Sequence, residues 1–327
     1  MPLSDSVFAL PRPSATRGTP EPPIPGPSEA AFTAAFGTLL PPAKYLVTDV
    51  GKAAYYEIPG LVNSAPSTGD KAPDRVLFIH GVQTPALGML PLARALHALY
   101  PCSHFALVDL WGHGLSDTPQ IPHEASLFHR LLDELLDKLG WPTVHVVGFS
   151  FGGALTAGYV ASRSSRISSF TLVAPAGLIR RAEFSVEEQG HLRGGGDEIA
   201  ARDWVVRWLE GGDLVVPADW KERIASGEVV AEAVKEWQMR EHPGHTASVV
   251  AVVRDGGVMD TDANFVRALS TGIPYLVVLG ELDGICSSQQ LSQLGFKNVT
   301  VVPQAGHGVV RDRVPEVTKI IRGFWEI

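Results

Sequence analysis

Residues 144–158 are VHVVGFSFGGALTAG, a stretch in which a buried strand turns sharply into a helix. The residues before Gly148 are mostly β-branched and apolar, as in a strand that is covered on both faces. A sharp strand-to-helix turn strains the backbone of Ser150, and Gly148 and Gly152 lack the β-carbons that would collide there. This Gly-x-Ser-x-Gly pattern is typical of a serine nucleophile, although a serine that only caps the helix is the alternative.

A second strand-and-turn segment supplies candidate partners for this serine. The apolar run Arg75–Ile79 is followed by His80-Gly81-Val82 and then by a helical pattern from Met89 to Leu99. Gly81 lets the chain bend tightly, so the Val82 amide can point into the same space as the Phe151 amide. Two converging N–H donors make an oxyanion hole, which stabilises charge on an attacked carbonyl. Taken alone, His80-Gly81 is also compatible with a simple turn.

An activated serine needs a base and an orienting acid, and both follow later strands. Strand Tyr275–Leu279 leads into Gly-Glu-Leu-Asp-Gly, and strand Val299–Val302 leads into a loop with His307 between two glycines. The resulting order Ser150, Asp283, His307 predicts a catalytic triad. Glu281 shares a face with Asp283 in an extended segment, so spacing alone does not choose between the two carboxylates.

These segments together resemble the α/β-hydrolase superfamily, in the form that carries an inserted helical cap. The resemblance runs from about residue 44 to the end of the chain and rests on five motifs: His80-Gly81, Asp109–Asp117, Gly148–Gly153, Gly280–Asp283 and Gly306-His307. It implies a Ser150–His307–Asp283 triad, an oxyanion hole at Val82 and Phe151, and no cofactor or metal. The family pattern Gly-x-x-Asp favours Asp283 over Glu281 as the acid.

The order of strands and helices predicts an α/β fold with a mostly parallel central sheet flanked by helices. A hairpin over 44–58 leads into alternating strands and helices up to residue 177, and this pattern resumes at 270–327. Between them, 178–269 is predicted to be a helical cap. Residues 1–43 form a proline-rich leader in which 1–27 is expected to be extended or disordered and outside any sheet. Ser28 is expected to cap a short helix over 29–36.

The cap is expected to select the substrate. Trp204 and Trp208 lie one helical turn apart in it, although such residues often only hold a cap to the body of the protein. We predict an apolar substrate pocket that includes both tryptophans together with Gly81 and Phe149. His245, near the end of the cap, is the candidate polar contact.

Composition limits the possible partners and location. A net charge of −8 and a pI near 5.8 argue against nucleic acid or an anionic membrane as partner. The sequence contains no apolar run long enough to span a bilayer, no phosphate-binding Gly-x-x-x-x-Gly-Lys loop and no metal-ligand spacing among its histidines. Its two cysteines suggest no disulfide framework, and the leader lacks the apolar core of a secretory signal. We therefore expect a cytoplasmic protein with a small-molecule substrate, whose oligomeric state the sequence does not fix.

The predicted activity is hydrolysis of a small or medium apolar carboxylic ester or lactone. Carbon–carbon bond hydrolases of this superfamily use the same triad, but they tend to carry an aromatic residue after the histidine, where this chain has Gly308. Perhydrolases, acyltransferases and small-molecule receptors on the same fold are the further alternatives.

Overall fold

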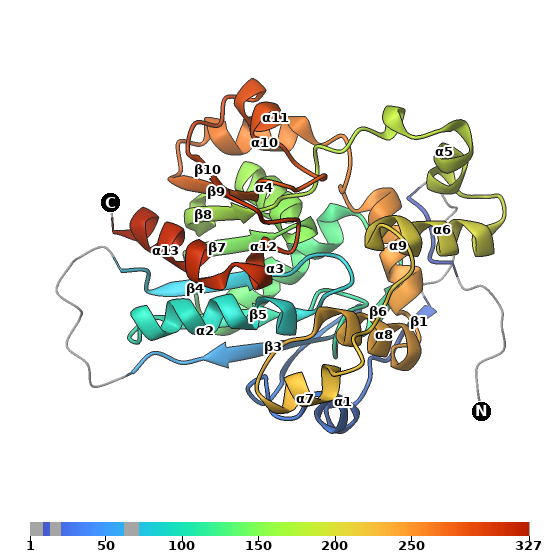
Figure 1. Ribbon diagram of the computed structural model, residues 1–327, viewed down its shortest axis with the longest axis horizontal. Coiled ribbons are helices and arrows are strands. Elements are labelled where there is room, and N and C mark those ends of the chain that lie inside the picture. Colours follow the sequence, from blue (N-terminus) through green and yellow to red (C-terminus); the bar gives the residue numbers. More distant parts are fainter. Residues whose placement is uncertain (1–8, 14–20, 62–71, 327) are drawn as a thin grey trace.

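The computed structural model describes residues 9–13, 21–61 and 72–326, and its centre is a large twisted sheet (Figure 1). The strands of this sheet are β2 (Lys44–Thr48), β3 (Gly51–Ile58), β4 (Arg75–Ile79), β5 (His104–Val108), β7 (Val144–Phe149), β8 (Ile167–Val173), β9 (Tyr275–Gly280) and β10 (Val299–Val302). Their order is β10-β9-β8-β7-β4-β5-β3-β2. All neighbours from β10 to β5 are parallel, whereas β3 is antiparallel to both β2 and β5. The predicted α/β fold is confirmed.

Helices cover both faces of the sheet. One face carries the 3₁₀ helix η1 (Ala86–Met89), α2 (Leu90–Leu99), α12 (Val309–Asp312) and α13 (Val314–Trp325); the other carries α3 (Ala125–Leu139), α4 (Phe151–Ser162), α10 (Asp262–Ser270) and α11 (Ser288–Gln293). Strand β7 shows the alternation expected of such a sheet, since Val144 and Val146 enter one apolar core while Val147 and Phe149 enter the other. Successive side chains of β7 thus point to opposite faces of the sheet, so this one strand contributes to both apolar cores.

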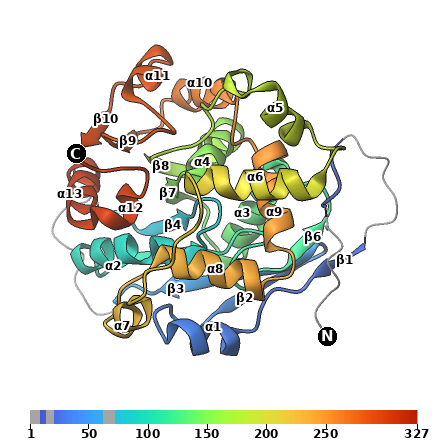
Figure 2. The same ribbon diagram turned by 45° about the vertical axis from the view of Figure 1, so that its right-hand side comes forward.

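The chain between β8 and β9 is helical. It contains the 3₁₀ turn η3 (Arg181–Glu183) and the helices α5 (Val186–Arg193), α6 (Glu198–Glu210), α7 (Trp220–Ala225), α8 (Ala231–Glu241) and α9 (His245–Asp255). Figure 1 shows α5, α6, α8 and α9 together at one side of the sheet, and Figure 2 brings α6 and α8 to the front. We call α5–α9 the cap.

The predicted cap range 178–269 also includes α10, but α10 packs on α4 beside the sheet. Phe265 and Ala268 on α10 are fully buried there in the sheet's core. This helix therefore belongs to the flanking layer, because its apolar face is covered by α4 rather than by cap helices. Within the described ranges, no helix combines the length and the apolar character that a membrane span requires.

The leader corrects one expectation. Glu21–Ile24 forms strand β1, which pairs antiparallel with β6 (Thr118–Gln120), although residues 1–27 were expected to lie outside any sheet. Proline has no N–H group to donate to a neighbouring strand. It is tolerated in β1 because this sheet has two strands and because only Glu21 and Ile24 are in register with β6. Residues 1–8 and 14–20 of the leader lie outside the described residues.

Helix α1 (Glu29–Phe36) begins as the sequence suggests, with the Ser28 hydroxyl accepting the Ala31 amide at 3.2 Å. Its buried rings Phe32 and Phe36 pack edge-on against Trp237 of α8, with centroids 5.4 and 5.6 Å away. The helix therefore docks on the cap as well as on the sheet.

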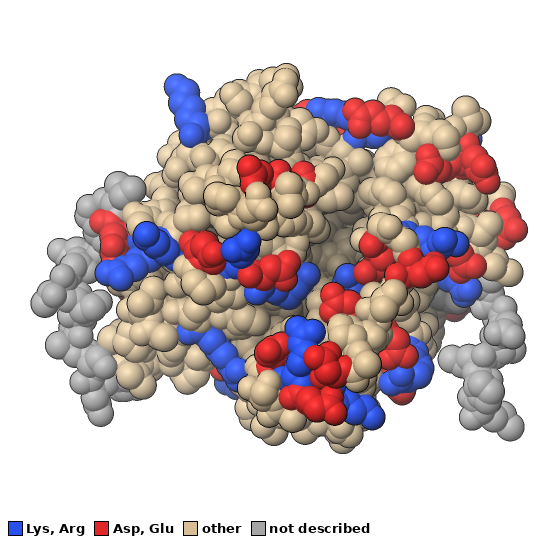
Figure 3. Space-filling view, viewed as in Figure 1, with Lys and Arg blue, Asp and Glu red and all other residues tan. Residues whose placement is uncertain are grey.

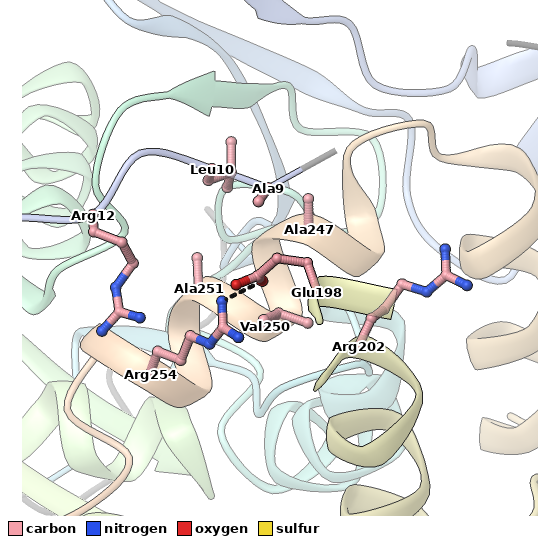
Figure 4. A pocket seen from close by; sticks show the side chains of 9 residues that line it. All are labelled: Ala9, Leu10, Arg12, Glu198, Arg202, Ala247, Val250, Ala251 and Arg254. Atoms are coloured by element: carbon pink, nitrogen blue, oxygen red, sulfur yellow. Dashed lines mark hydrogen bonds and ion pairs between the residues drawn. The ribbon is translucent and has the colours of Figure 1, made fainter. Parts of the chain in front are cut away.

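A short piece of the leader, residues 9–13, also docks on the cap. Leu10 is buried, and Arg12 donates to the Asp255 carboxylate at 2.8 Å and to the Arg193 carbonyl at 2.9 Å. Figure 4 shows these residues over a small pocket between α6 and α9, where Arg254 pairs with Glu198. This contact joins both ends of the cap to the start of the chain.

Histidines are buried in the core and beneath the cap, and burial disfavours their charged forms. Burial lowers the pKa to about 4 in His80, His123, His129 and His242 and to about 3 in His245. The rings instead serve as neutral hydrogen-bonding groups: the His80 Nε2 accepts the Leu110 amide at 2.9 Å, for example. Within the described residues, no group of such side chains is placed to hold a metal ion.

We predict that acid destabilises the fold between pH 6.5 and 4. In this window the histidines of the unfolded chain, with pKa near 6.5, bind protons, whereas the buried histidines of the folded protein stay neutral. The free energy of unfolding therefore falls as pH falls. Burial raises the pKa of Asp109 to about 6, which acts in the opposite sense, but one carboxyl offsets only part of the effect. Thermal melts followed by circular dichroism should show Tm about 10 °C lower at pH 5.5 than at pH 7.5. An unchanged or rising Tm would contradict this assignment.

Candidate active site

Ser150 stands at the turn between β7 and α4 in a strained conformation, with φ 52° and ψ −116°. The turn is held by the Ser150 amide, which donates to the Val173 carbonyl at 3.0 Å. A β-carbon on Gly148 would lie 2.4 Å from the Gly152 carbonyl oxygen, and one on Gly152 would lie 2.2 Å from the Ile79 carbonyl oxygen. The steric reason that the sequence suggested for both glycines is therefore present in the structure.

The structure brings Ser150, His307 and Asp283 into one hydrogen-bonded chain. The Ser150 Oγ lies 3.0 Å from the His307 Nε2, and the His307 Nδ1 lies 3.2 Å from both oxygens of Asp283. A neutral imidazole that donates from Nδ1 to the carboxylate leaves Nε2 free to accept the serine proton. The Asp283 side chain is fully buried, whereas the His307 side chain is 35% exposed and so can face a substrate.

Asp283 and Glu281 have separate contacts. Asp283 accepts the Ile285 amide at 2.7 Å in addition to the His307 ring. Glu281 instead accepts the amide of Gln304 at 2.8 Å, which braces the turn after β10. Asp283 is thus the carboxylate that contacts the His307 ring, whereas Glu281 contacts the loop that carries this histidine.

Two backbone amides adjoin the serine. Phe151 follows it directly, and Val82 follows Gly81, whose backbone runs so close that a β-carbon there would lie 2.9 Å from the Ser150 Cβ. Neither amide donates a hydrogen bond to another described residue. The two donors are therefore available to a bound oxygen, as an oxyanion hole requires.

The loop that carries Val82 is fixed by the cap, a feature that the sequence analysis missed. Gln83 has a positive φ of 65°. Its amide donates to the His113 ring at 3.2 Å, and its carbonyl accepts the fully buried Gln238 side chain of α8 at 2.5 Å. Gln238 also accepts the Gly114 amide at 2.7 Å. One cap glutamine thus positions the candidate oxyanion loop; nothing in its local sequence distinguishes it from a surface glutamine.

Of the predicted pocket residues, Gly81 and Phe149 lie at the serine. The Phe149 ring is 5.2 Å from that of His307. Trp204 and Trp208 stack on one another at 6.0 Å, and both contact Phe184 edge-on. These ring contacts lie within the chain between β8 and β9 and reach neither the sheet nor the serine. A substrate role for either tryptophan, and the alternative that they hold the cap to the body, both stay predictions.

His245 lies elsewhere than expected. Its Nδ1 is 2.8 Å from the Gly112 carbonyl oxygen, and its ring packs edge-on against His113 at 4.9 Å. It is fully buried, and its described contacts are with the 109–118 turn and the cap, not with Ser150 or His307. The contacts therefore support a role in seating α9 on the core, since the ring's described partners are backbone and rings of the 109–118 turn and of the cap.

Comparison with known proteins settles the family. Residues 76–318 match the model of the alpha/beta hydrolase family. The chain belongs to this family. A protein of Bacillus subtilis (strain 168), provisionally named 2-succinyl-6-hydroxy-2,4-cyclohexadiene-1-carboxylate synthase, is 22% identical over 270 residues, which cover 81% of this chain and 95% of that protein.

Two further relatives carry the names of hydrolases. Lipase LipV of Mycobacterium tuberculosis (strain ATCC 25618 / H37Rv) is 37% identical over 108 residues, which cover 33% of this chain and 40% of the lipase. The crystal structure of the enol-lactonase from Burkholderia xenovorans LB400 superposes with a TM-score of 0.63 at 20% identity, covering 86% of this chain and 99% of that structure. The structural likeness shows the shared fold, and together with the family match the relatives identify the chain as a hydrolase enzyme.

We predict that Gly152→Ala destabilises the protein by about 3 kcal/mol or more, because the added methyl overlaps the backbone of β4. Gly323→Ala in α13 is the matched control, since a β-carbon there meets nothing within 4 Å. This control is expected to stabilise by up to about 1 kcal/mol, as alanine favours a helix. Urea unfolding of both variants measures the difference, and equal midpoints would refute the steric account.

Proposed function

We propose that this enzyme is a serine hydrolase that cleaves a small or medium apolar carboxylic ester or lactone through an acyl-enzyme. The observation that carries the proposal is the continuous hydrogen-bonded chain from the Ser150 hydroxyl through His307 to the buried Asp283 carboxylate. Its supporting feature is the pair of unengaged amides beside the same hydroxyl. A nucleophile, a base with an oriented ring and an anion-binding pair are the parts that acyl transfer needs.

In the first half of the proposed reaction, the Ser150 oxygen bonds to the substrate carbonyl carbon while its proton passes to the His307 Nε2. The carbonyl oxygen becomes an oxyanion, which accepts hydrogen bonds from the Val82 and Phe151 amides. Collapse of this intermediate breaks the carbon–oxygen bond of the ester, and the imidazolium returns its proton to the leaving alcohol. Asp283 stabilises the imidazolium throughout.

In the second half, His307 takes a proton from a water molecule, whose oxygen bonds to the acyl carbon. The second oxyanion accepts hydrogen bonds from the same two amides. Its collapse breaks the bond between the acyl carbon and the Ser150 oxygen, which regains its proton from His307. The product is a carboxylic acid, and for a lactone both halves of the substrate leave as one hydroxy acid. No redox step or cofactor enters this sequence.

The substrate class rests on the surroundings of the serine and on the relatives. Phe149 precedes Ser150, and its apolar ring lies 5.2 Å from the ring of His307, which favours an apolar acyl group. Lipase LipV and the enol-lactonase carry names of the same reaction class. The substrate is then a small molecule, and a cytoplasmic location remains part of the proposal.

We predict that a fluorophosphonate probe labels Ser150 in the folded protein. Labelling should disappear in Ser150→Ala and slow by at least about a hundredfold in His307→Ala, because the hydroxyl then lacks its base. Ser162→Ala, a serine at the far end of the same helix, is the matched control and should label normally. Peptide mapping by mass spectrometry locates the adduct; no adduct on folded wild-type protein would overturn the proposal and favour a binding protein.

We further expect Asp283→Asn to lower kcat on p-nitrophenyl esters by about 10²- to 10⁴-fold, because the ring of His307 loses its orienting carboxylate. Glu281→Gln is the matched control and should retain activity to within about threefold, since among the described residues this carboxylate is hydrogen-bonded to the Gln304 amide and not to His307. A larger loss in Glu281→Gln than in Asp283→Asn would reverse the assignment. A panel of rising acyl length, with a dienone acid beside it, separates ester from carbon–carbon cleavage by rate.

A further inference from the structure

Arg311 lies on α12, in the segment that follows His307. Its guanidinium carbon stands 5.3 Å from the centroid of the Phe149 ring, and that ring is 5.2 Å from the imidazole of His307. The cation and the proposed base therefore both lie against the same aromatic ring. A cation over an aromatic face is held weakly and keeps its N–H groups for other partners.

The guanidinium has an unfilled donor. Its Nη1 atom is buried, yet within the described residues it has no hydrogen-bond partner and no carboxylate within ion-pair distance. Arg313, two residues later, pairs with Glu316 at 3.2 Å in the ordinary way. A buried charged donor without a partner is costly, so its retention points to a partner that comes and goes.

A second unfilled donor faces the same point. The Thr84 hydroxyl is buried without a hydrogen-bond partner in the loop that follows the candidate oxyanion donors. The Thr84 Oγ1 and the Arg311 Nη1 lie 3.4 and 3.7 Å from the position that a β-carbon on Gly88 would occupy. Two donors from different segments, neither with a partner among the described residues, thus lie near each other beside Gly88 of η1.

Carboxylates around Arg311 do not fill this place. Asp312 on its own helix, Glu232 on α8 and Glu210 on α6 all act on the guanidinium charge from outside ion-pair distance. Glu210 is instead bound to Lys235 at 2.8 Å. Burial lowers the pKa of Arg311, but arginine starts so high that the group remains charged.

The hollow at this face is rimmed by both signs of charge. Figure 3 shows it between the sheet part of the molecule and the cap, with Lys, Arg, Asp and Glu side chains around it. The surface charge around the hollow therefore gives no general attraction for an anionic substrate. Discrimination between charged and neutral substrates would depend on an individual side chain within the site.

We propose that Arg311 and Thr84 form a subsite for a carboxylate group on the ester or lactone that this enzyme cleaves. This inference rests on the proposed function and deepens it: the scissile carbonyl sits at Ser150, an apolar spacer crosses Phe149, and the distal carboxylate accepts hydrogen bonds from the guanidinium and the hydroxyl. A charge-assisted pair of this kind is stronger than a neutral hydrogen bond and fixes the substrate's direction.

The test compares esters that differ only in this charge. Mono-p-nitrophenyl esters of adipic and suberic acid are assayed beside the same compounds with the second carboxyl methylated, and p-nitrophenolate release gives kcat/KM. We expect the wild-type enzyme to prefer the acid by about 10- to 100-fold for at least one chain length. Arg311→Met should abolish this preference, Arg311→Lys should retain part of it, and Thr84→Val should reduce it.

Arg322→Met on α13 is the matched control, because Arg322 forms an exposed ion pair with Glu326 near the end of that helix. It should keep the wild-type ratio, and thermal melts verify that each variant is folded. An equal ratio in wild type and Arg311→Met, or a wild-type preference for the methylated esters, overturns the subsite. Fluorophosphonate labelling of Ser150 separates the two proposals, since a labelled enzyme without charge preference loses only the subsite, whereas an unlabelled one loses the hydrolase mechanism.

Discussion

The backbone of Ser150 can hold a positive φ only because glycines surround it. Gly148 and Gly152 let the turn close between β7 and α4, and Gly81 lets the neighbouring loop approach the serine from β4. This steric constraint exposes the hydroxyl at the end of a buried strand and at the same time places two backbone amides beside it. The placement of the proposed nucleophile and of the proposed oxyanion-hole amides therefore follows from one close approach, and a side chain at any of these three positions would separate them.

The remaining site groups are held by loops that depend on other parts of the fold. Glu281 braces the turn that carries His307, while Gln238 of the cap fixes the carbonyl of Gln83 beside the candidate oxyanion donors. The cap therefore does more than cover the core, because one of its buried side chains holds the loop that carries Val82, the proposed oxyanion donor. Neutral histidines fill the contact between cap and core, where charged groups would pay for lost hydration.

Charge is distributed unevenly in this protein. Many arginines on the described surface pair with carboxylates, as Arg322 does with Glu326, whereas Arg311 beside Phe149 has no such partner among the described residues. A buried cation close to a site is expensive unless something compensates it. Its position against Phe149, the ring that also contacts the proposed base, fits the proposed carboxylate subsite, because small-molecule sites commonly combine apolar walls with a few polar anchors.

The sequence alone determined the sheet, the nucleophile turn and the chain order of Ser150, Asp283 and His307. These features depend on local sterics and on apolar periodicity, which are written in neighbouring residues. Periodicity did not separate α10 from the cap, because an amphipathic helix looks the same whichever apolar surface covers it. It also missed β1, since a short proline-containing strand forms only when β6 is present to pair with it. Tertiary structure alone decided the contacts of His245, Gln238 and Arg311. Whether such a polar side chain is buried, and whether it has a hydrogen-bond partner, depends on residues more than sixty positions away in the chain. The local sequence around each residue does not contain this information.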